Sequence, residues 1–153
     1  MRLFVMRHGQ AESIAPTDEQ RSLTELGKAE VGAVARQHLS HIQFDQVYVS
    51  PYLRAQQSWQ AIQNAGVEFQ QQETVDWITP DTSPQKAADQ LLERTANAQT
   101  VLLVCHQPFV GRFTTLLCDG HDHGMPIATG GLVTMDTEVI ARQCATLNTI
   151  VSP

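Results

Sequence analysis

Two short apolar runs constrain the fold of this chain more than any other feature of its sequence. They cover Leu3–Met6 and Val101–Cys105, and neither alternates apolar with polar residues. Such runs are typical of strands that are covered on both faces, which occur mainly in parallel sheets flanked by helices. The first run ends at Arg7–Gly9 and the second at His106. The sequence therefore predicts a buried sheet with polar side chains where its strands end.

Segments with helical spacing separate the predicted strands. Their inward faces are expected to be formed by Val31, Val34, Ala35, His38 and Leu39; by Tyr52, Ala55, Trp59 and Ile62; by Ala87, Ala88, Leu91, Leu92 and Thr95; and by Phe109, Phe113, Leu116 and Leu117. Thr24 is a suitable N-cap for the first helix, Gly66 a stop for the second and Pro108 a first residue for the last.

The remaining strands are less distinct in the sequence. Val47–Val49 predicts a second buried strand, and a short strand is expected around Glu73–Val75. The run Gln70–Gln72 is interpreted as a solvated strand end or loop. Residues 132–135 and 139–147 predict two final strands that form a hairpin, because only about three residues separate them.

Strands that alternate with helices predict an α/β fold, a three-layer α/β/α sandwich around a mostly parallel sheet. Open sheets of this kind bind ligands outside the carboxyl ends of their strands. His8, Arg54 and His106 each follow a predicted strand, so we expect all three at the same edge. With 153 residues, the chain has the length of one domain, expected to cover 1–153.

The composition excludes several classes of protein. Ten Lys and Arg against 16 Asp and Glu give a formal net charge of −6, and no basic block is present, so nucleic acid is not expected as a partner. The three cysteines form no Cys-x-x-Cys pair for zinc or redox chemistry. The apolar runs are too short for a membrane helix or a signal peptide, so no membrane partner is expected and the predicted location is cytoplasmic.

Three motifs together resemble the histidine phosphatase superfamily. They are Arg-His-Gly at residues 7–9, Ser-Pro-x-x-Arg-Ala-x-Gln at residues 50–57, and His106 directly after a hydrophobic strand. The small size and the run Arg21–Gly27 are similar to the SixA-type phosphohistidine phosphatases of that superfamily. The resemblance implies a minimal phosphoglycerate mutase-like sandwich without a lid insertion.

The residue types in these motifs suit a phosphoryl group, which carries close to two negative charges and three acceptor oxygens. Planar, permanently charged guanidinium groups bind two such oxygens at once, and Arg7, Arg54 and Arg21 supply them. A neutral imidazole at His8 is able to attack phosphorus in line and form a covalent intermediate. Gly9 has no Cβ, which allows the backbone to approach a ligand closely.

The resemblance assigns roles to the same residues. It implies that His8 is the nucleophile, that Arg7, Arg54 and His106 complete the catalytic phosphate pocket, and that Arg21 and Gly9 add phosphate contacts. The family chemistry uses no metal and no cofactor. His121–His123 places two imidazoles and a carboxylate on a loop, but ligands at i and i+2 rarely complete a metal site, so the rim of the pocket is the expected place for this segment.

The general acid distinguishes the possible substrates. Superfamily branches that cleave phosphate esters place an acid beside the leaving alkoxide, whereas here only Asp76 and Asp81 are candidates and no motif surrounds them. Imidazole is a far better leaving group than an alkoxide, so the missing acid favours phosphohistidine. The expected partner is a phosphorylated histidine-phosphotransfer domain of a sensor kinase. The alternatives are a small-molecule phosphomonoesterase or mutase, and a non-catalytic phosphoryl-binding module.

Overall fold

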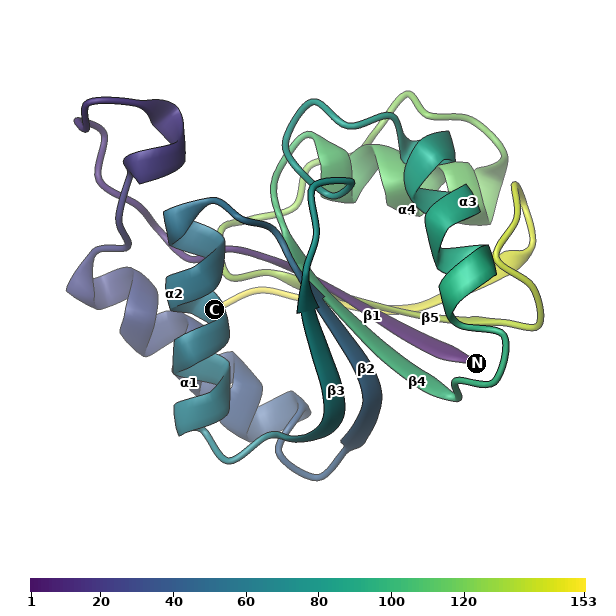
Figure 1. The fold of residues 1–153 in the computed structure, drawn as a ribbon, viewed down its shortest axis with the longest axis horizontal. Helices are drawn as coiled ribbons and strands as arrows, with labels where there is room; N and C mark the ends of the chain where they lie inside the picture. The colour runs from purple at the N-terminus through teal and green to yellow at the C-terminus, as the bar shows by residue number, and fades with distance from the viewer.

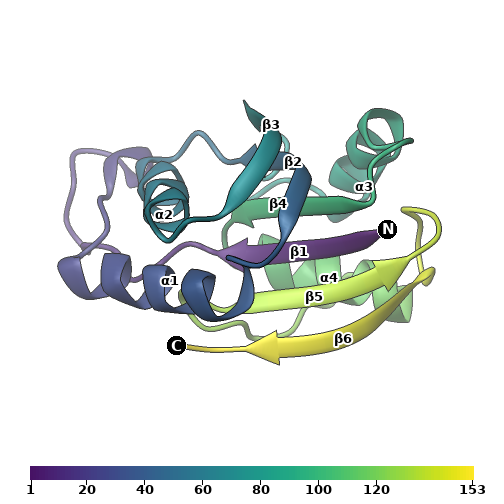
Figure 2. The same ribbon diagram turned by 90° about the horizontal axis from the view of Figure 1, so that it is seen from below.

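The computed structural model describes residues 1–153 as a six-stranded sheet with helices on both faces (Figures 1 and 2). The strands are β1 (Arg2–Arg7), β2 (Gln43–Val49), β3 (Glu68–Thr74), β4 (Thr100–Cys105), β5 (Leu132–Thr137) and β6 (Ala145–Val151). The helices are α1 (Glu25–His38), α2 (Leu53–Asn64), α3 (Pro84–Arg94) and α4 (Phe109–Asp119), with a short 3-10 helix, η1 (Asp18–Gln20), before α1. The predicted three-layer sandwich is confirmed.

The strand order is β3-β2-β4-β1-β5-β6. The pairs β2·β3, β2·β4 and β1·β4 are parallel, and β5 is antiparallel to both β1 and β6. In the register of the parallel strands Arg7 lies opposite Cys105, and Val49 lies opposite Val104. The chain therefore leaves β1, β2 and β4 at one common edge of the sheet, as a mostly parallel arrangement requires.

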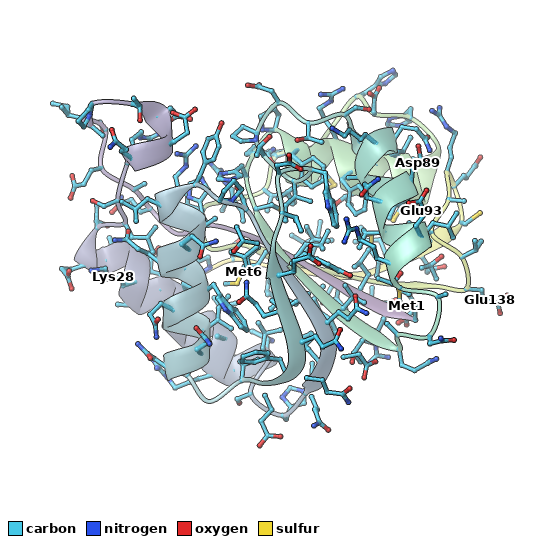
Figure 3. The ribbon with its side chains drawn as sticks, in the orientation of Figure 1. Met1, Met6, Lys28, Asp89, Glu93 and Glu138 are labelled. Carbon is cyan, nitrogen blue, oxygen red and sulfur yellow. The ribbon has the colours of Figure 1, made fainter.

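The central strands are buried on both faces because their side chains alternate between two apolar clusters. Leu3 and Val5 pack on the side of α3 and α4, whereas Phe4 and Met6 pack on the side of α1 and α2. Each fully buried side chain of this size contributes about 1.5–3 kcal/mol. Figure 3 shows Met6 inside the molecule, while the labelled side chains of α1, α3 and the loop after β5 point outward. The strand ends that carry polar residues are thus held by a packed core.

The helix boundaries follow local signals, with one exception at the start of α4 and one further difference in the buried face of α3. Thr24 caps α1 as predicted, because its Oγ1 accepts a hydrogen bond from the Gly27 amide at 3.0 Å. Pro108 is the N-cap of α4 instead of its first residue. Leu92 was expected on the inward face of α3 but is 48% exposed, because the apolar stripe of this helix is narrower than predicted. No helix has both the length and the apolar character needed to cross a membrane.

The two edge strands differ most from the sequence-based expectation. A strand is present where one was expected around Glu73–Val75, but its bounds differ: β3 spans Glu68–Thr74 and includes the solvated run Gln70–Gln72. Every side chain of β3 is exposed, so the strand depends on its parallel backbone pairing with β2 and leaves no apolar pattern. The hairpin of β5 and β6 is confirmed, but β6 begins only at Ala145.

Candidate active site

The predicted site residues meet at the carboxyl edge of β1 and β4. His8 follows β1, His106 follows β4, and Arg54 lies in the first turn of α2. The ring centroids of His8 and His106 are 5.1 Å apart, and Nε of Arg54 donates to Nε2 of His8 at 3.2 Å. All three side chains are buried. The prediction that they lie at the same edge is confirmed.

The hydrogen bonds of His8 fix which ring nitrogen carries the proton. Nδ1 lies 2.7 Å from the carbonyl oxygen of Gly9, and a carbonyl only accepts, so Nδ1 holds the hydrogen. Nε2 is then an unprotonated nitrogen that accepts from Arg54. Burial is the main reason that the pKa of His8 is lowered to about 4; the bond to Gly9 opposes this shift and the charge of Arg54 adds to it. The ring is therefore neutral at pH 7, with its lone pair in the pocket.

Backbone contacts hold His8 in this orientation. Its amide donates to the Cys105 carbonyl and its carbonyl accepts from the Gly130 amide, both at 2.9 Å. The Gly9 amide donates to Oγ of Ser58 at 3.0 Å, so it is already used. A Cβ on Gly9 would lie 2.6 Å from the carbonyl oxygen of Gly27 in α1. The expected reason for a glycine here therefore needs correction: the close approach is to α1, and the Gly9 amide is not free for a phosphate.

Two buried nitrogens in the pocket have no protein partner. Arg7 donates from Nη1 to the Ile127 carbonyl at 2.7 Å, but its Nε is unpartnered. His106 lies 2.6 Å from Oγ of Ser50 through Nε2, and its Nδ1 is unpartnered. A buried polar group without a hydrogen bond costs about 1–3 kcal/mol. Both nitrogens are therefore available for a hydrogen bond to a ligand.

The electrostatics of the pocket favour an anion. Burial, with smaller contributions from His8 and the arginines, holds the pKa of His106 far below its ordinary value, so this ring is also neutral. Burial and the nearby Arg54 lower the pKa of Arg7, although a guanidinium remains charged at neutral pH. The pocket thus combines two neutral imidazoles with fixed positive charge.

Four further residues complete the site and were not assigned by sequence reasoning. Ser50 and Ser58 bond His106 and Gly9 as described, and the Tyr52 ring lies 4.9 Å from the His106 ring and 5.0 Å from the Arg54 guanidinium carbon. Asp18 accepts hydrogen bonds from Arg54. Ser50 and Tyr52 belong to the motif at residues 50–57, which was a usable signal. Asp18 lies at the start of η1, where the sequence contains no motif that would have indicated it.

Arg21 reaches the site indirectly. Its Nη1 donates to the Asp18 carboxylate at 3.1 Å and its Nε to the Glu12 carbonyl at 2.7 Å. The side chain is 31% exposed, against 4% for Arg54. Arg21 therefore lies at the mouth of the pocket, joined to Arg54 through Asp18.

The other candidate residues remain outside this network. Asp76 and Asp81 are exposed, and neither makes a side-chain hydrogen bond or ion pair with Arg7, His8, Arg54 or His106. Asp81 is nevertheless near the site, because burial raises the pKa of Tyr52 and the surrounding carboxylates, Asp81 among them, add to that shift. His121 and His123 stack at 4.4 Å, and the Asp122 carboxylate pairs with Arg112 at 2.8 Å. No group of three or more His, Cys, Asp or Glu side chains is arranged to hold a metal ion.

Comparisons with known proteins agree with the geometry. The histidine phosphatase superfamily (branch 1) matches residues 3–76. The chain is 34% identical over 126 residues to the phosphohistidine phosphatase SixA homolog of Haemophilus influenzae, covering 76% of this chain and 77% of that protein. It is 32% identical over 123 residues to phosphohistidine phosphatase SixA of Escherichia coli, covering 78% and 76%.

Solved structures share the fold over its whole length. The structure of the protein histidine phosphatase SixA complexed with tungstate superimposes with a TM-score of 0.86 at 27% identity, covering 100% of this chain and 97% of that one. The alpha-ribazole phosphatase from Shigella flexneri gives a TM-score of 0.73 at 17% identity, covering 99% and 96%. The second likeness, at this low identity, concerns the fold alone.

Proposed function

The chain belongs to the histidine phosphatase superfamily, and on that premise we propose that it is a metal-independent phosphohistidine phosphatase that uses His8 as its nucleophile. The observation that carries the proposal is the state of His8: a neutral ring, buried, with Nδ1 bonded to the Gly9 carbonyl and Nε2 presented to Arg54. A binding module has no need of an unprotonated nitrogen in this position.

In the first half of the reaction, Nε2 of His8 attacks phosphorus in line with the leaving group. The bond between phosphorus and the substrate imidazole breaks, and its electron pair stays on the leaving nitrogen. When the other ring nitrogen of the substrate carries a proton, the product is neutral imidazole and no acid is required. Arg7 and Arg54 stabilise the charge on the phosphoryl oxygens. We assign to Nδ1 of His106, which has no protein partner, a hydrogen bond to one of these oxygens when Nδ1 carries the proton.

In the second half, water attacks the phosphorus on His8. The bond between phosphorus and Nε2 breaks, its electron pair returns to Nε2, and the proton released by water leaves with the phosphate or to solvent. The His8 ring carries a positive charge while it is phosphorylated. The 2.7 Å contact between Nδ1 and the Gly9 carbonyl stabilises that charge throughout the cycle.

We infer that the substrate is a phosphorylated histidine-phosphotransfer domain of a phosphorelay. The relatives in Haemophilus influenzae and Escherichia coli carry the name phosphohistidine phosphatase, which supports a phosphohistidine substrate. Neither Asp76 nor Asp81 is hydrogen-bonded to a residue of the site, which also supports a leaving group that needs no acid.

The test offers the protein a phosphorylated histidine-phosphotransfer domain and, in parallel, a panel of phosphate esters. We expect faster turnover of the domain, with an acid-labile phosphoryl group on the enzyme in rapid-quench samples. Faster ester turnover that disappears in the Asp76→Asn, Asp81→Asn double variant would support the phosphomonoesterase instead. Binding of the domain without any release of phosphate would support the module.

A further inference from the structure

We propose that Asp18 is a positioning residue that orients Arg54 and Arg21 toward the phosphoryl group. The proposal deepens the proposed function and rests on it. Asp18 is the first residue of η1, in the loop between β1 and α1, and its side chain is 53% exposed. An exposed carboxylate at the mouth of an anion site is unexpected on charge alone, because it repels the ligand. Its contacts give the reason for its place.

Asp18 accepts hydrogen bonds from the end of the Arg54 guanidinium through two different atoms. Its backbone carbonyl accepts from Nη1 at 2.6 Å and its carboxylate oxygen Oδ2 accepts from Nη2 at 3.0 Å. The only other side-chain hydrogen bond of Arg54 runs from Nε to His8. Because the guanidinium is planar, these two acceptors fix its rotation and direct the Nε edge at the nucleophile. That edge is where the phosphoryl oxygens arrive.

The second carboxylate oxygen of Asp18 holds the other arginine. Oδ1 accepts from Nη1 of Arg21 at 3.1 Å, and the Arg21 amide donates to the Asp18 carbonyl at 3.2 Å. Each arginine side chain carries about 2 kcal/mol of rotamer entropy, which has to be lost when it binds phosphate. A residue that orders both guanidinium groups in advance reduces that loss at the time of binding.

Packing does not account for the position of Asp18. The helix η1 has no buried residue, and Figures 1 and 2 show its loop standing away from the body of the molecule, next to the start of α2. At its base, the Glu12 backbone amide donates to the Ser22 carbonyl at 2.8 Å, and Ala11 and Leu23 form an isolated antiparallel β-bridge. Between this base and the site, the contacts of Asp18 with the two arginines hold the loop in place.

The sign of one measurement separates positioning from simple repulsion. If the carboxylate acts only through its charge, its removal strengthens anion binding; if it positions the arginines, its removal weakens binding. Sulfate is a suitable probe because it remains a dianion at neutral pH and needs no catalysis. The control is Asp136→Asn, which removes the same charge from an ion pair with Arg2 at the opposite end of β1.

Calorimetric titration with sulfate should show about tenfold weaker binding for Asp18→Ala, an intermediate effect for Asp18→Asn and no change for Asp136→Asn. Unchanged or tighter sulfate binding by Asp18→Ala would overturn the proposal. Thermal unfolding of each variant establishes that it is folded.

A double-mutant cycle with Arg54→Ala tests whether Asp18 acts through Arg54. In the Arg54→Ala background, the effect of Asp18→Ala should shrink from about tenfold to about threefold, because only Arg21 remains to be oriented. An equal effect in both backgrounds would refute the coupling. Absence of phosphohistidine turnover would count against the proposed function but would not affect the sulfate result. Unchanged sulfate binding by Asp18→Ala would count against the positioning role but would not affect the proposed function.

Discussion

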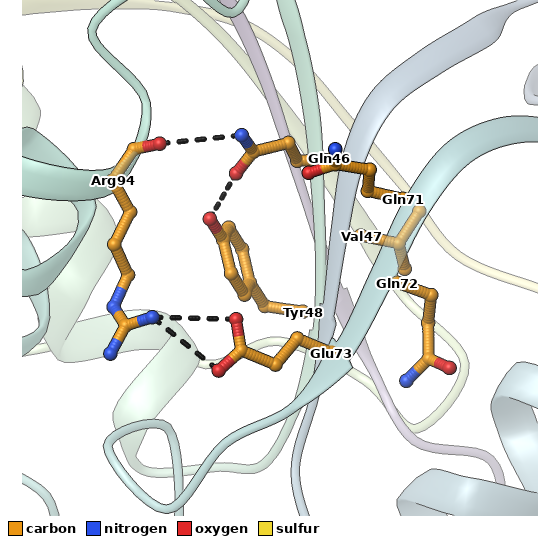
Figure 4. Close-up of a pocket in the computed structure, with 7 residues that line it drawn as sticks. All are labelled: Gln46, Val47, Tyr48, Gln71, Gln72, Glu73 and Arg94. Carbon is orange, nitrogen blue, oxygen red and sulfur yellow. Dashed lines mark hydrogen bonds and ion pairs between the residues drawn. The ribbon is translucent and has the colours of Figure 1, made fainter.

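The hollow beside β3 and the site at the carboxyl edge of the sheet are both lined by polar side chains, but these are paired in different ways. The hollow has a volume of about 470 Å³ and lies between β2, β3 and the end of α3. Figure 4 shows that four of its residues are bonded to one another: Arg94 donates to Glu73 at 3.3 Å and accepts from Gln46 through its carbonyl, and Tyr48 donates to Gln46. The side chains of Gln71 and Gln72 are exposed. None of its lining side chains has a buried atom without a partner.

The site at the carboxyl edge is the opposite case. Two of its buried nitrogens, Nε of Arg7 and Nδ1 of His106, lack partners, and its nucleophile candidate is an imidazole kept neutral by burial. Polar groups that are paired or exposed to water gain little from a ligand, whereas unsatisfied buried donors gain a full hydrogen bond. The carboxyl-edge site is therefore distinguished by two unpaired nitrogens that lie together with His8 and Arg54, and not by the size of a depression; the third unpaired buried nitrogen, Nε1 of Trp77, lies outside the site.

The largest expected difference between the two regions concerns catalysis. His8→Ala should lower the turnover of a phosphorylated histidine-phosphotransfer domain at least about a thousandfold, because the attacking atom is removed. The matched change in the hollow, Tyr48→Phe, removes one hydroxyl from a paired network and should leave turnover unchanged. Steady-state assays of both variants check this, and activity retained by His8→Ala would exclude the proposed nucleophile.

The second difference is a dependence of stability on pH below neutrality, which His8 of the carboxyl-edge site produces. The pKa of His8 is about 4 when folded, against 6.5 for an ordinary imidazole, so the unfolded chain binds the proton more readily. The free energy of unfolding therefore has its full value, as far as His8 is concerned, above pH 6.5. It should fall by about 3 kcal/mol as the pH is lowered toward 4. Urea unfolding of the native chain and of His8→Gln across this range should show a shallower slope for the variant. Equal slopes would mean that His8 is not protected from protonation.

The third comparison replaces an arginine by lysine in each region. Arg54→Lys keeps the charge but loses the planar fork that contacts His8 and Asp18, so kcat/KM should fall by about 30- to 100-fold. Arg94→Lys in the hollow, whose pair with Glu73 is partly exposed, should keep full activity. A similar loss in both variants would contradict the distinction between the regions.

The smallest effect is expected from the ion pair of the hollow. Glu73→Gln leaves an exposed neutral partner for Arg94 and should change the free energy of unfolding by less than about 1 kcal/mol. Thermal unfolding in low and high salt measures this. A larger loss would show that the hollow, and with it the β3 edge, contributes more to the fold than its exposed pairs indicate.

The parts of the fold that were predictable share one property, a signal carried by residues that are close together in the sequence. β1 and β4 were visible as unbroken apolar runs, and Thr24 was visible as a cap because its hydroxyl bonds a residue three positions away. β3 was predicted only in its last residues, because all its side chains are exposed and its stability comes from backbone pairing with β2, a strand that is distant in sequence. Backbone pairing leaves no mark on side-chain composition.

The candidate site divides in the same way. The order of strands and helices in the sequence was enough to place His8, Arg54 and His106 at one edge, since each follows a strand of a mostly parallel sheet. The protonation of His8, the use of the Gly9 amide by Ser58, and the hydrogen bonds of Asp18 to Arg54 became known from the three-dimensional structure alone. Burial and hydrogen bonding between distant segments set these properties, because a pKa and an unsatisfied donor depend on what surrounds a group in space.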